Sequence, residues 1–221
     1  MVIAIDGPAG AGKSTVAKAL ARRLNISYLD TGAMYRALTL KALRAKINLE
    51  NEDALAALAK KSVIDLKTDG TKGLRVLLDG EDVSADIRTL EVTNSTFYVA
   101  RAPRVREILV KWQRAIAARQ SVVAEGRDIG TVVFPQATKK FYLDADFEER
   151  SLRRIRELET GGRHVDAAQL KKELKERDTK DMTRSASPLK KADDAIFVDS
   201  THMSVDTVVE LMMKHIHVSK V

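Results

Sequence analysis

Cysteine is absent from this chain of 221 residues. Disulfide bonds and thiolate metal sites are therefore excluded, and the composition fits a reducing compartment. No apolar run approaches the length that spans a bilayer, and an apolar β-branched run starts at residue 2, which leaves no room for a secretory leader. We therefore expect a soluble, cytoplasmic protein.

Aromatic residues make up only 5% of the chain and do not alternate with the basic residues. The formal net charge of +7 is by itself typical of nucleic-acid-binding proteins. This charge is nevertheless spread over segments such as 148–159, where acidic and basic residues alternate. Arginine also suits proteins whose ligands carry phosphate groups. We therefore expect small phosphorylated ligands and neither a nucleic-acid nor a membrane partner. We also expect a monomer.

The most specific motif lies at residues 7–14, which match the pattern G-x-x-x-x-G-K-[ST]. An apolar run precedes it, and apolar residues at helical spacing follow it up to Leu24. A glycine-rich turn between a strand and a helix binds phosphate through main-chain N–H groups and the helix dipole. We expect Lys13 to contact the outer phosphates of a nucleoside triphosphate and Ser14 to ligate Mg²⁺. The residues expected to bind this nucleotide are Gly7, Pro8, Ala9, Gly10, Ala11, Gly12, Lys13, Ser14 and Thr15.

Apolar runs separated by helical patterns predict an α/β fold with a five-stranded parallel sheet and helices on both faces. The expected strands cover residues 2–6, 26–30, 121–125, 140–144 and 195–199, and a last helix is expected at about 205–217. Each of these runs ends in Asp or Glu. Ligands of open parallel sheets bind beyond the carboxyl ends of the strands, so functional residues are expected there.

Two gaps between the expected strands are longer than a crossover helix needs. The first begins with helical segments at 33–43 and 53–60. Alternating apolar residues then surround Asp-Gly steps at 69–70 and 79–80, which predicts a small antiparallel sheet before the helices of 89–118. The second gap, 147–188, is arginine-rich and nearly all helical, with a break at 161–162, and predicts a mobile flap. We expect one unit: its core comprises residues 1–32, 119–147 and 188–221, its insert residues 33–118, and its lid residues 148–187.

Two polar segments directly follow expected strands. Arg36 lies one turn into the helix after the second strand, and we expect Thr31 to cap that helix. Arg127 and Asp128 follow the third strand, where loops carry function. An ordinary surface arginine and a local salt bridge are the respective alternatives.

The flap contains the remaining basic candidates. Arg177, Asp181 and Arg184 lie at helical spacings and can share one face, with a solvated, salt-bridged helix as the alternative. The arginines at 150–156 could likewise pair with glutamates that flank them. The histidines show no metal-ligand spacing, and we assign them no role.

Six blocks in this order resemble the bacterial cytidylate kinases: IDGPAGAGKST, LDTGAMYR, EDVSADIRT, APRVRE, EGRDIGTVVFP and ERDTKDMTRSASPL. The resemblance runs from residue 2 to about residue 200. It implies a P-loop nucleoside monophosphate kinase of pyrimidine metabolism, which transfers the γ-phosphoryl group of ATP to CMP or dCMP with Mg²⁺. The inserted antiparallel sheet is also a feature of that family.

The resemblance further implies the roles of individual residues. Arg36, Arg127 and Arg184 would hold the α-phosphate of CMP and, with Lys13, form the catalytic set. Asp181, with Thr31 nearby, would contact the sugar hydroxyls. Arg106 and Asp128 would read the cytosine edge, with Asp128 accepting a hydrogen bond from the exocyclic amine.

Two positions depart from the family pattern. Phe97 stands where a small hydroxyl residue is expected to touch the base, so that this contact falls to Ser95 or Thr96 or is missing. Lys180 stands where an arginine is common in the lid. The departure at Phe97 affects the selectivity for the base, and the departure at Lys180 affects one contact of the lid.

No general base is evident, and the implied reaction needs none, because the acceptor phosphate is largely a dianion at pH 7. The difficulty is to bring two charged phosphates into line, and the cations would offset their repulsion. Asp30 and Asp128 are alternatives for the carboxylate that holds the water ligands of the metal. Two other functions stay open: a shikimate-kinase-like enzyme acting on an alcohol, and a nucleotide-dependent nucleic-acid-binding protein.

Overall fold

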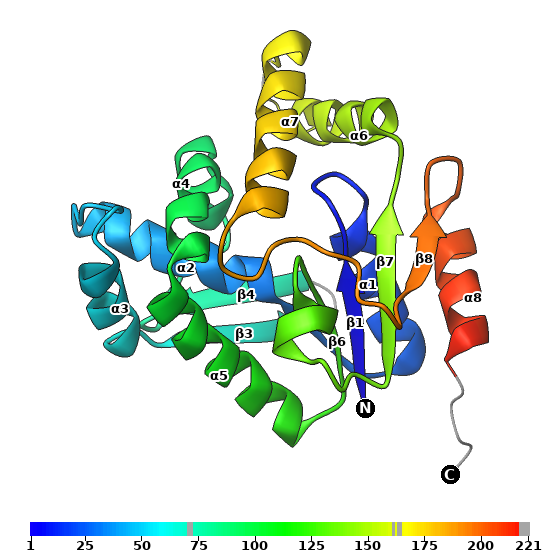
Figure 1. Cartoon of the computed structure of the whole chain (residues 1–221), viewed down its shortest axis with the longest axis horizontal. Coiled ribbons are helices and arrows are strands. Elements are labelled where there is room, and N and C mark those ends of the chain that lie inside the picture. Colours follow the sequence, from blue (N-terminus) through cyan, green and yellow to red (C-terminus); the bar gives the residue numbers. More distant parts are fainter. Residues whose placement is uncertain (70–72, 161, 163–164, 217–221) are drawn as a thin grey trace. The chain divides into compact units, whose positions relative to one another are not determined.

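The computed structural model describes residues 1–69, 73–160, 162 and 165–216 (Figure 1). The chain divides into two compact units, one made of Met1–Ile26 and Val122–Val221 and the other of Ser27–Ser121. Each unit is described by itself. In the described part of the chain, no helix combines the length and the apolar character that a membrane crossing requires.

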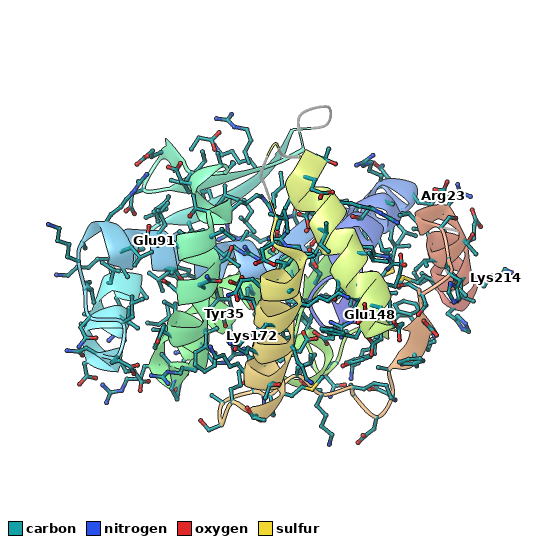
Figure 2. All side chains as sticks on the ribbon, turned by 90° about the horizontal axis from the view of Figure 1, so that it is seen from above. Arg23, Tyr35, Glu91, Glu148, Lys172 and Lys214 are labelled. Atoms are coloured by element: carbon teal, nitrogen blue, oxygen red, sulfur yellow. The ribbon has the colours of Figure 1, made fainter. Side chains whose placement is uncertain are left out.

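The first unit contains the phosphate-loop motif and the predicted flap. Its elements are β1 (Val2–Asp6), α1 (Lys13–Leu24), β6 (Val122–Gly126), the π-helical turn η2 (Ile129–Val133), β7 (Lys139–Asp144), α6 (Phe147–Thr160), α7 (Ala167–Thr183), β8 (Ile196–Asp199) and α8 (Val205–His215). The flap is helical as predicted, and its two helices α6 and α7, on which Figure 2 labels Glu148 and Lys172, pack against each other. Lys171 of α7 is paired to Glu148 of α6.

The second unit includes all of the residues predicted as the insert, 33–118. Its elements are β2 (Ser27–Asp30), α2 (Thr31–Arg44), α3 (Glu52–Lys60), β3 (Ile64–Asp69), β4 (Gly73–Leu78), β5 (Glu81–Asp82), the 3₁₀ turn η1 (Asp86–Arg88), α4 (Leu90–Arg101) and α5 (Pro103–Arg119). Helix α2 packs on α4, and α3 packs on α5.

The main sheet has the strand order β2-β6-β1-β7-β8. Strand β1 pairs in parallel with both β6 and β7, and β7 pairs in parallel with β8, which confirms the predicted parallel sheet. Strands β1 and β6 are nearly all buried and are apolar up to Asp6 and Glu125 near their ends, as is typical of central parallel strands. The register sets Asp6 of β1 opposite Gly126 of β6, so the residues that follow both strands emerge at the same edge.

Helix α1 lies beside α8, as Arg23 of α1 and Lys214 of α8 show in Figure 2. The buried stripe of α1 includes Val16 and Leu20, whose spacing follows the helical period. The predicted last helix ends at His215, and residue 217, where the prediction ended, lies outside the described residues.

The small sheet of the second unit is antiparallel with the order β3-β4-β5, as predicted. Strands β4 and β5 are joined by Asp79 and Gly80, whose φ angles are 51° and 91°. Two positive φ angles in a two-residue hairpin loop define the turn for which Asp-Gly steps are selected. The other predicted step includes residue 70, which lies outside the described residues.

One local prediction is wrong. Thr31 does not cap α2 but is its first residue, and Asp30 is the cap, with its Oδ1 accepting a hydrogen bond of 2.9 Å from the N–H of Ala33. A carboxylate that directly precedes the helix satisfies its free N–H groups and also interacts favourably with the helix dipole.

Candidate functional site

The phosphate loop joins β1 to α1 (Figure 1). Gly7 has a φ of +149°, and a Cβ there would lie 1.9 Å from the carbonyl oxygen of Leu143, so only glycine fits. The N–H groups of Gly10, Ala11 and Gly12 donate to no other group in the described part of the chain. The N–H groups of the first turn of α1 have no partner within a helix. The loop thus presents a run of unpaired donors and the positive end of a helix dipole to an anion.

Side chains fix the orientation of the loop's peptide groups. Three loop carbonyls each accept a hydrogen bond from a side chain: Pro8 from Lys13 Nζ at 2.6 Å, Ala9 from Arg150 Nη1 at 2.9 Å and Ala11 from Ser200 Oγ at 3.2 Å. In a planar trans peptide the C=O and the following N–H point in opposite directions. The N–H groups of Gly10 and Gly12 are therefore directed away from Arg150 and Ser200.

Lys13 is the buried cation of the loop, with 5% of its surface exposed. Burial lowers the pKa of Lys13 to about 7, and the neighbouring charge of Arg127 acts in the same direction. Glu125 and Asp181 oppose this shift. A bound polyphosphate would stabilise the ammonium form and compensate for its burial, so Lys13 is placed to act on phosphate.

The lid helices contact the phosphate loop directly. Asp178 of α7 accepts a hydrogen bond of 3.2 Å from the N–H of Ala9 and a charged one of 2.5 Å from Arg150 of α6. A Cβ on Gly10 would lie 2.9 Å from the carbonyl oxygen of Arg150, so α6 also packs against the loop backbone.

Sequence reasoning missed both members of this ion pair. It left Arg150 as a helical arginine that could pair with nearby glutamates, and it assigned no role to Asp178. The sequence offered one weak signal, because Asp178 follows Leu170 and Leu174 at four-residue spacing and so shares their apolar face. The structure shows that Leu174 and Asp178 are the buried residues of α7. Two other flap arginines do pair locally, Arg153 with Glu149 at 3.0 Å and Arg154 with Glu157 at 2.6 Å.

Asp6 organises the turn that follows β6. Its carboxylate ends β1 and accepts hydrogen bonds of 2.8 Å and 2.7 Å from the N–H groups of Ile129 and Gly130. Burial raises the pKa of Asp6 to about 6, although these two hydrogen bonds favour the ionised form. The charge of Asp128 adds to the rise. Asp6 therefore holds the segment that carries Arg127 and Asp128.

Asp6→Asn should remove a pH dependence of stability. The folded protein keeps the Asp6 proton up to about pH 6, whereas the unfolded chain releases it near 3.8. The contribution of Asp6 to the free energy of unfolding is therefore present below pH 4 and decreases through pH 6, by about 3 kcal/mol at roughly 1.4 kcal/mol per pKa unit. Urea unfolding between pH 4 and 7.5 should show this decrease in the parent protein and in exposed Asp193→Asn. Parallel curves for the parent and Asp6→Asn would contradict the assignment.

The structure brings four predicted acceptor residues together in two pairs. Arg127 Nε donates to Asp181 Oδ2 at 2.8 Å, and Arg184 Nη2 lies 3.5 Å from Asp128 Oδ1. Burial opposes ionisation of Asp181, but its arginine neighbours, Arg127 first, outweigh burial and hold its pKa below the ordinary value. The loop after β6 and the end of α7 thus form one charged cluster.

Arg177 belongs to the surroundings of this cluster. Its charge acts on both Lys13 and Asp181, lowering the pKa of each. Sequence reasoning placed Arg177 on the same helical face as Asp181 but gave it no place among the site residues. Its proximity to the buried lysine makes it a further cation for a phosphate ligand.

The second unit holds the other predicted acceptor residues. Arg36 of α2 donates to Thr93 Oγ1 of α4 at 3.2 Å. Arg106 is buried at the start of α5, donates to the carbonyl of Ala100 at 3.2 Å, and lies 5.5 Å from the ring centre of Tyr35, which Figure 2 labels on α2. Helices α2, α4 and α5 therefore fix the two arginines of this unit.

The positions that depart from the family pattern lie on α4. The guanidinium of Arg101 lies 5.3 Å from the ring centre of Phe97 and 5.1 Å from that of Tyr98. Thr96 donates its hydroxyl proton to the carbonyl of Val92 at 2.6 Å, one turn back in the same helix. The Thr96 hydroxyl can therefore only accept a further hydrogen bond. Ser95 is the other hydroxyl residue that the sequence analysis named for the contact with the base.

A parallel sheet, a strand–loop–helix phosphate cradle, a buried lysine and an arginine-bearing helical lid together define a P-loop kinase. The comparisons with known proteins specify the family. The family model described as cytidylate kinase matches residues 3–218. The chain belongs to the cytidylate kinase family, which confirms the resemblance.

Individual relatives agree over nearly the whole chain. The cytidylate kinase of Desulforamulus reducens is 53% identical over 218 residues, which cover 99% of this chain and 97% of the relative. That of Pelotomaculum thermopropionicum is 50% identical over 214 residues, or 97% of this chain and 95% of the relative. A crystal structure of an uncharacterized protein from Eubacterium ventriosum, 17% identical, superposes with a TM-score of 0.52 over 97% of each chain and shows the fold alone.

Proposed function

We propose that the chain transfers the γ-phosphoryl group of ATP to CMP or dCMP, producing ADP and CDP or dCDP. It is an ATP-dependent nucleoside monophosphate kinase. Membership of the cytidylate kinase family supports the reaction, and the two alternative functions are not favoured. The structural observation that carries the proposal is the cluster of Arg127, Asp128, Asp181 and Arg184, two of which, Arg127 and Asp181, act through their charges on the buried Lys13 of the phosphate loop.

On the donor side, the phosphate loop holds ATP. The N–H groups from Gly10 to Thr15 and the Lys13 ammonium bind the β- and γ-phosphates. Pro8 has no N–H and the N–H of Ala9 donates to Asp178, so these two residues shape the loop rather than donate to phosphate.

The donor set fits Mg²⁺. The Ser14 hydroxyl is exposed at the start of α1, and Mg²⁺ takes oxygen ligands from a hydroxyl, from phosphates and from water. When bound, the ion offsets negative charge on the β- and γ-phosphates. Asp30 and Asp128 stay the alternatives for holding its water ligands; the first caps α2 and the second faces Arg184.

On the acceptor side, the three arginines Arg36, Arg127 and Arg184 hold the α-phosphate of CMP. They offset the repulsion between donor and acceptor phosphates, and no general base is needed because the acceptor is already a dianion. Asp181 and Thr31 bind the sugar hydroxyls. Closure of the lid excludes water and so limits hydrolysis of ATP.

The base is recognised by charge and by hydrogen bonds. Asp128 accepts a hydrogen bond from the cytosine amine, and Arg106 binds the remaining edge. Because Phe97 replaces a hydroxyl residue and the proton of Thr96 is already donated, Ser95 is the residue that adds a donor to the base. In this proposal the kinase is a cytoplasmic monomer without a nucleic-acid partner, with a core of residues 1–32, 119–147 and 188–221, an insert of residues 33–118 and a lid of residues 148–187.

A coupled assay of ADP release tests the function. Purified protein with MgATP should phosphorylate CMP and dCMP, and it should show little activity with AMP, GMP or shikimate. Activity with shikimate alone would instead establish the alcohol kinase. ADP release that depends only on added nucleic acid would establish the other alternative.

The acceptor arginines give a residue-level test. Arg36→Ala, Arg127→Ala and Arg184→Ala should each raise the KM for CMP by about 10- to 150-fold, since each removes a charge-assisted contact of roughly 1.5–3 kcal/mol. The KM for ATP should change far less. Arg119→Ala, at the exposed end of α5, is the control. An effect confined to the KM for ATP would assign that arginine to the donor side.

A further inference from the structure

Helix α7 contacts two loops that the proposed function assigns to different substrates. Asp178 accepts a hydrogen bond of 3.2 Å from the N–H of Ala9 in the phosphate loop. Asp181, one turn further on, accepts one of 2.8 Å from Arg127 in the loop after β6. Residues three apart on a helix share a face, so the two contacts lie next to each other. The same helix therefore touches the donor loop and the acceptor loop.

The contact with the donor loop is a clamp on a single residue. Asp178 takes the N–H of Ala9, while Arg150 donates to the carbonyl of Ala9 at 2.9 Å. The two side chains also pair with each other at 2.5 Å, and both are less than 10% exposed. Removing one member of a buried pair leaves the other charge uncompensated, so the clamp resists opening. Ala9 cannot move without moving α6 and α7 or breaking these bonds.

Asp178 also acts on Arg127 at a distance. Burial opposes the charge of Arg127, and the nearby carboxylates of Asp181, Glu125 and Asp178 outweigh it and raise the pKa of Arg127. The clamp on Ala9 and the acceptor arginine thus belong to one electrostatic neighbourhood. A rearrangement at either loop changes the interactions of the other.

We propose that Asp178 is a positioning residue that couples ATP binding at the phosphate loop to CMP binding, by holding α7 to Ala9 while α7 holds Arg127 through Asp181. This inference rests on the proposed function. Phosphates bound by the N–H groups restrict the motion of the loop. Because Asp178 and Arg150 bond to Ala9, the bound phosphates also restrict the motion of α7. Two ligands that each stabilise the same placement of one element bind cooperatively, and the coupling is reciprocal.

The test is a binding cycle. Calorimetry measures the Kd of CMP with and without a saturating, non-hydrolysable magnesium–ATP analogue. In the parent protein the analogue should tighten CMP binding by about fivefold or more, a typical coupling. In Asp178→Asn this factor should fall to within about twofold of one, while the Kd of CMP without the analogue changes little. The reverse measurement, of analogue binding with and without CMP, should give the same factors.

Control variants distinguish the effect of the position of Asp178 from the effects of a lost charge and of misfolding. Glu176→Gln removes the same charge from the exposed face of α7 and should keep the parental coupling. Asp178→Glu keeps a carboxylate and should restore part of it. If Asp178→Asn does not fold, as judged by circular dichroism, Arg150→Gln tests the same clamp, because the shorter, neutral glutamine removes the ion pair with Asp178; its coupling should also fall.

The outcomes are distinct. Parental coupling in a folded Asp178→Asn protein would overturn the inference, as would a uniform weakening of both ligands with the coupling preserved, which indicates a purely structural role. A parent protein that binds both ligands without coupling would overturn the inference and leave the proposed function intact. A parent protein that does not bind CMP would overturn the proposed function itself.

Discussion

Replacing Lys13 by methionine should lower kcat by about 10³-fold or more, as the loss of one preorganised electrostatic group does in other enzymes. Lys13 is buried in the phosphate loop, where its Nζ donates to the carbonyl of Pro8 at 2.6 Å. Methionine fills most of the same volume, so that the variant loses the charge without leaving a large cavity. The measurement is kcat for ADP release with saturating CMP and MgATP, with circular dichroism as the check on folding.

The lowered pKa of Lys13 predicts that the protein takes up protons when it binds the ATP analogue. Because burial lowers the pKa of Lys13 to about 7, part of the free protein carries a neutral lysine at pH 7.5. The triphosphate favours the ammonium, so binding of the ATP analogue should take up protons at this pH, and affinity should decrease as the pH rises above 7. Calorimetry in buffers of different ionisation enthalpy measures the uptake.

Two results would contradict the role of Lys13. One is a near-parental kcat in a folded Lys13→Met protein, which would remove the lysine from the transition state. The other is equal proton uptake by the parent and Lys13→Met. Arg22→Ala, which removes an exposed cation from the same helix, is the matched control and should leave both quantities unchanged.

Asp128→Asn should abolish most of the preference for CMP over UMP. A site that hydrogen-bonds a polar group rejects an analogue lacking that group by as much as about 10⁴-fold. An Asp128 carboxylate accepts from the cytosine amine but faces a carbonyl in uracil, where two acceptors would meet. The asparagine has the same size and offers an amide donor to uracil. The ratio of kcat/KM for CMP to that for UMP should approach one, mainly through loss on CMP.

The ratio of kcat/KM for CMP to that for UMP separates effects on base recognition from effects on phosphate binding. Asp128 lies 3.5 Å from Arg184 and directly follows Arg127, so the substitution also disturbs two phosphate contacts. If Arg127 and Arg184 bind the phosphate as proposed, that disturbance lowers kcat/KM for both substrates and cancels in the ratio. An unchanged ratio, or a parent enzyme that already treats CMP and UMP alike, would refute the role of Asp128 in reading the base.

Features encoded over a few neighbouring residues could be predicted. The phosphate loop depends on glycines at set spacings, and Gly7 takes a φ of +149°, which other residues rarely adopt. The Asp79-Gly80 hairpin follows from two residues that tolerate positive φ. The strand ends predicted where the candidate site lies, because parallel strands direct their carboxyl ends to one edge. One local prediction was nevertheless wrong, because Asp30 rather than Thr31 caps α2.

The sequence by itself therefore determined the order of the elements, the phosphate loop and the family, because turn residues, hydrophobic periodicity and contiguous motifs are all local. Only the tertiary structure decided which charges meet. Asp178 lies 169 residues from Ala9 and 28 from Arg150, and Asp6 lies 123 residues from Ile129. No spacing rule joins such positions. Their pairing depends on packing that brings distant strand ends and helices together and removes them from water, where a buried charge must find a partner.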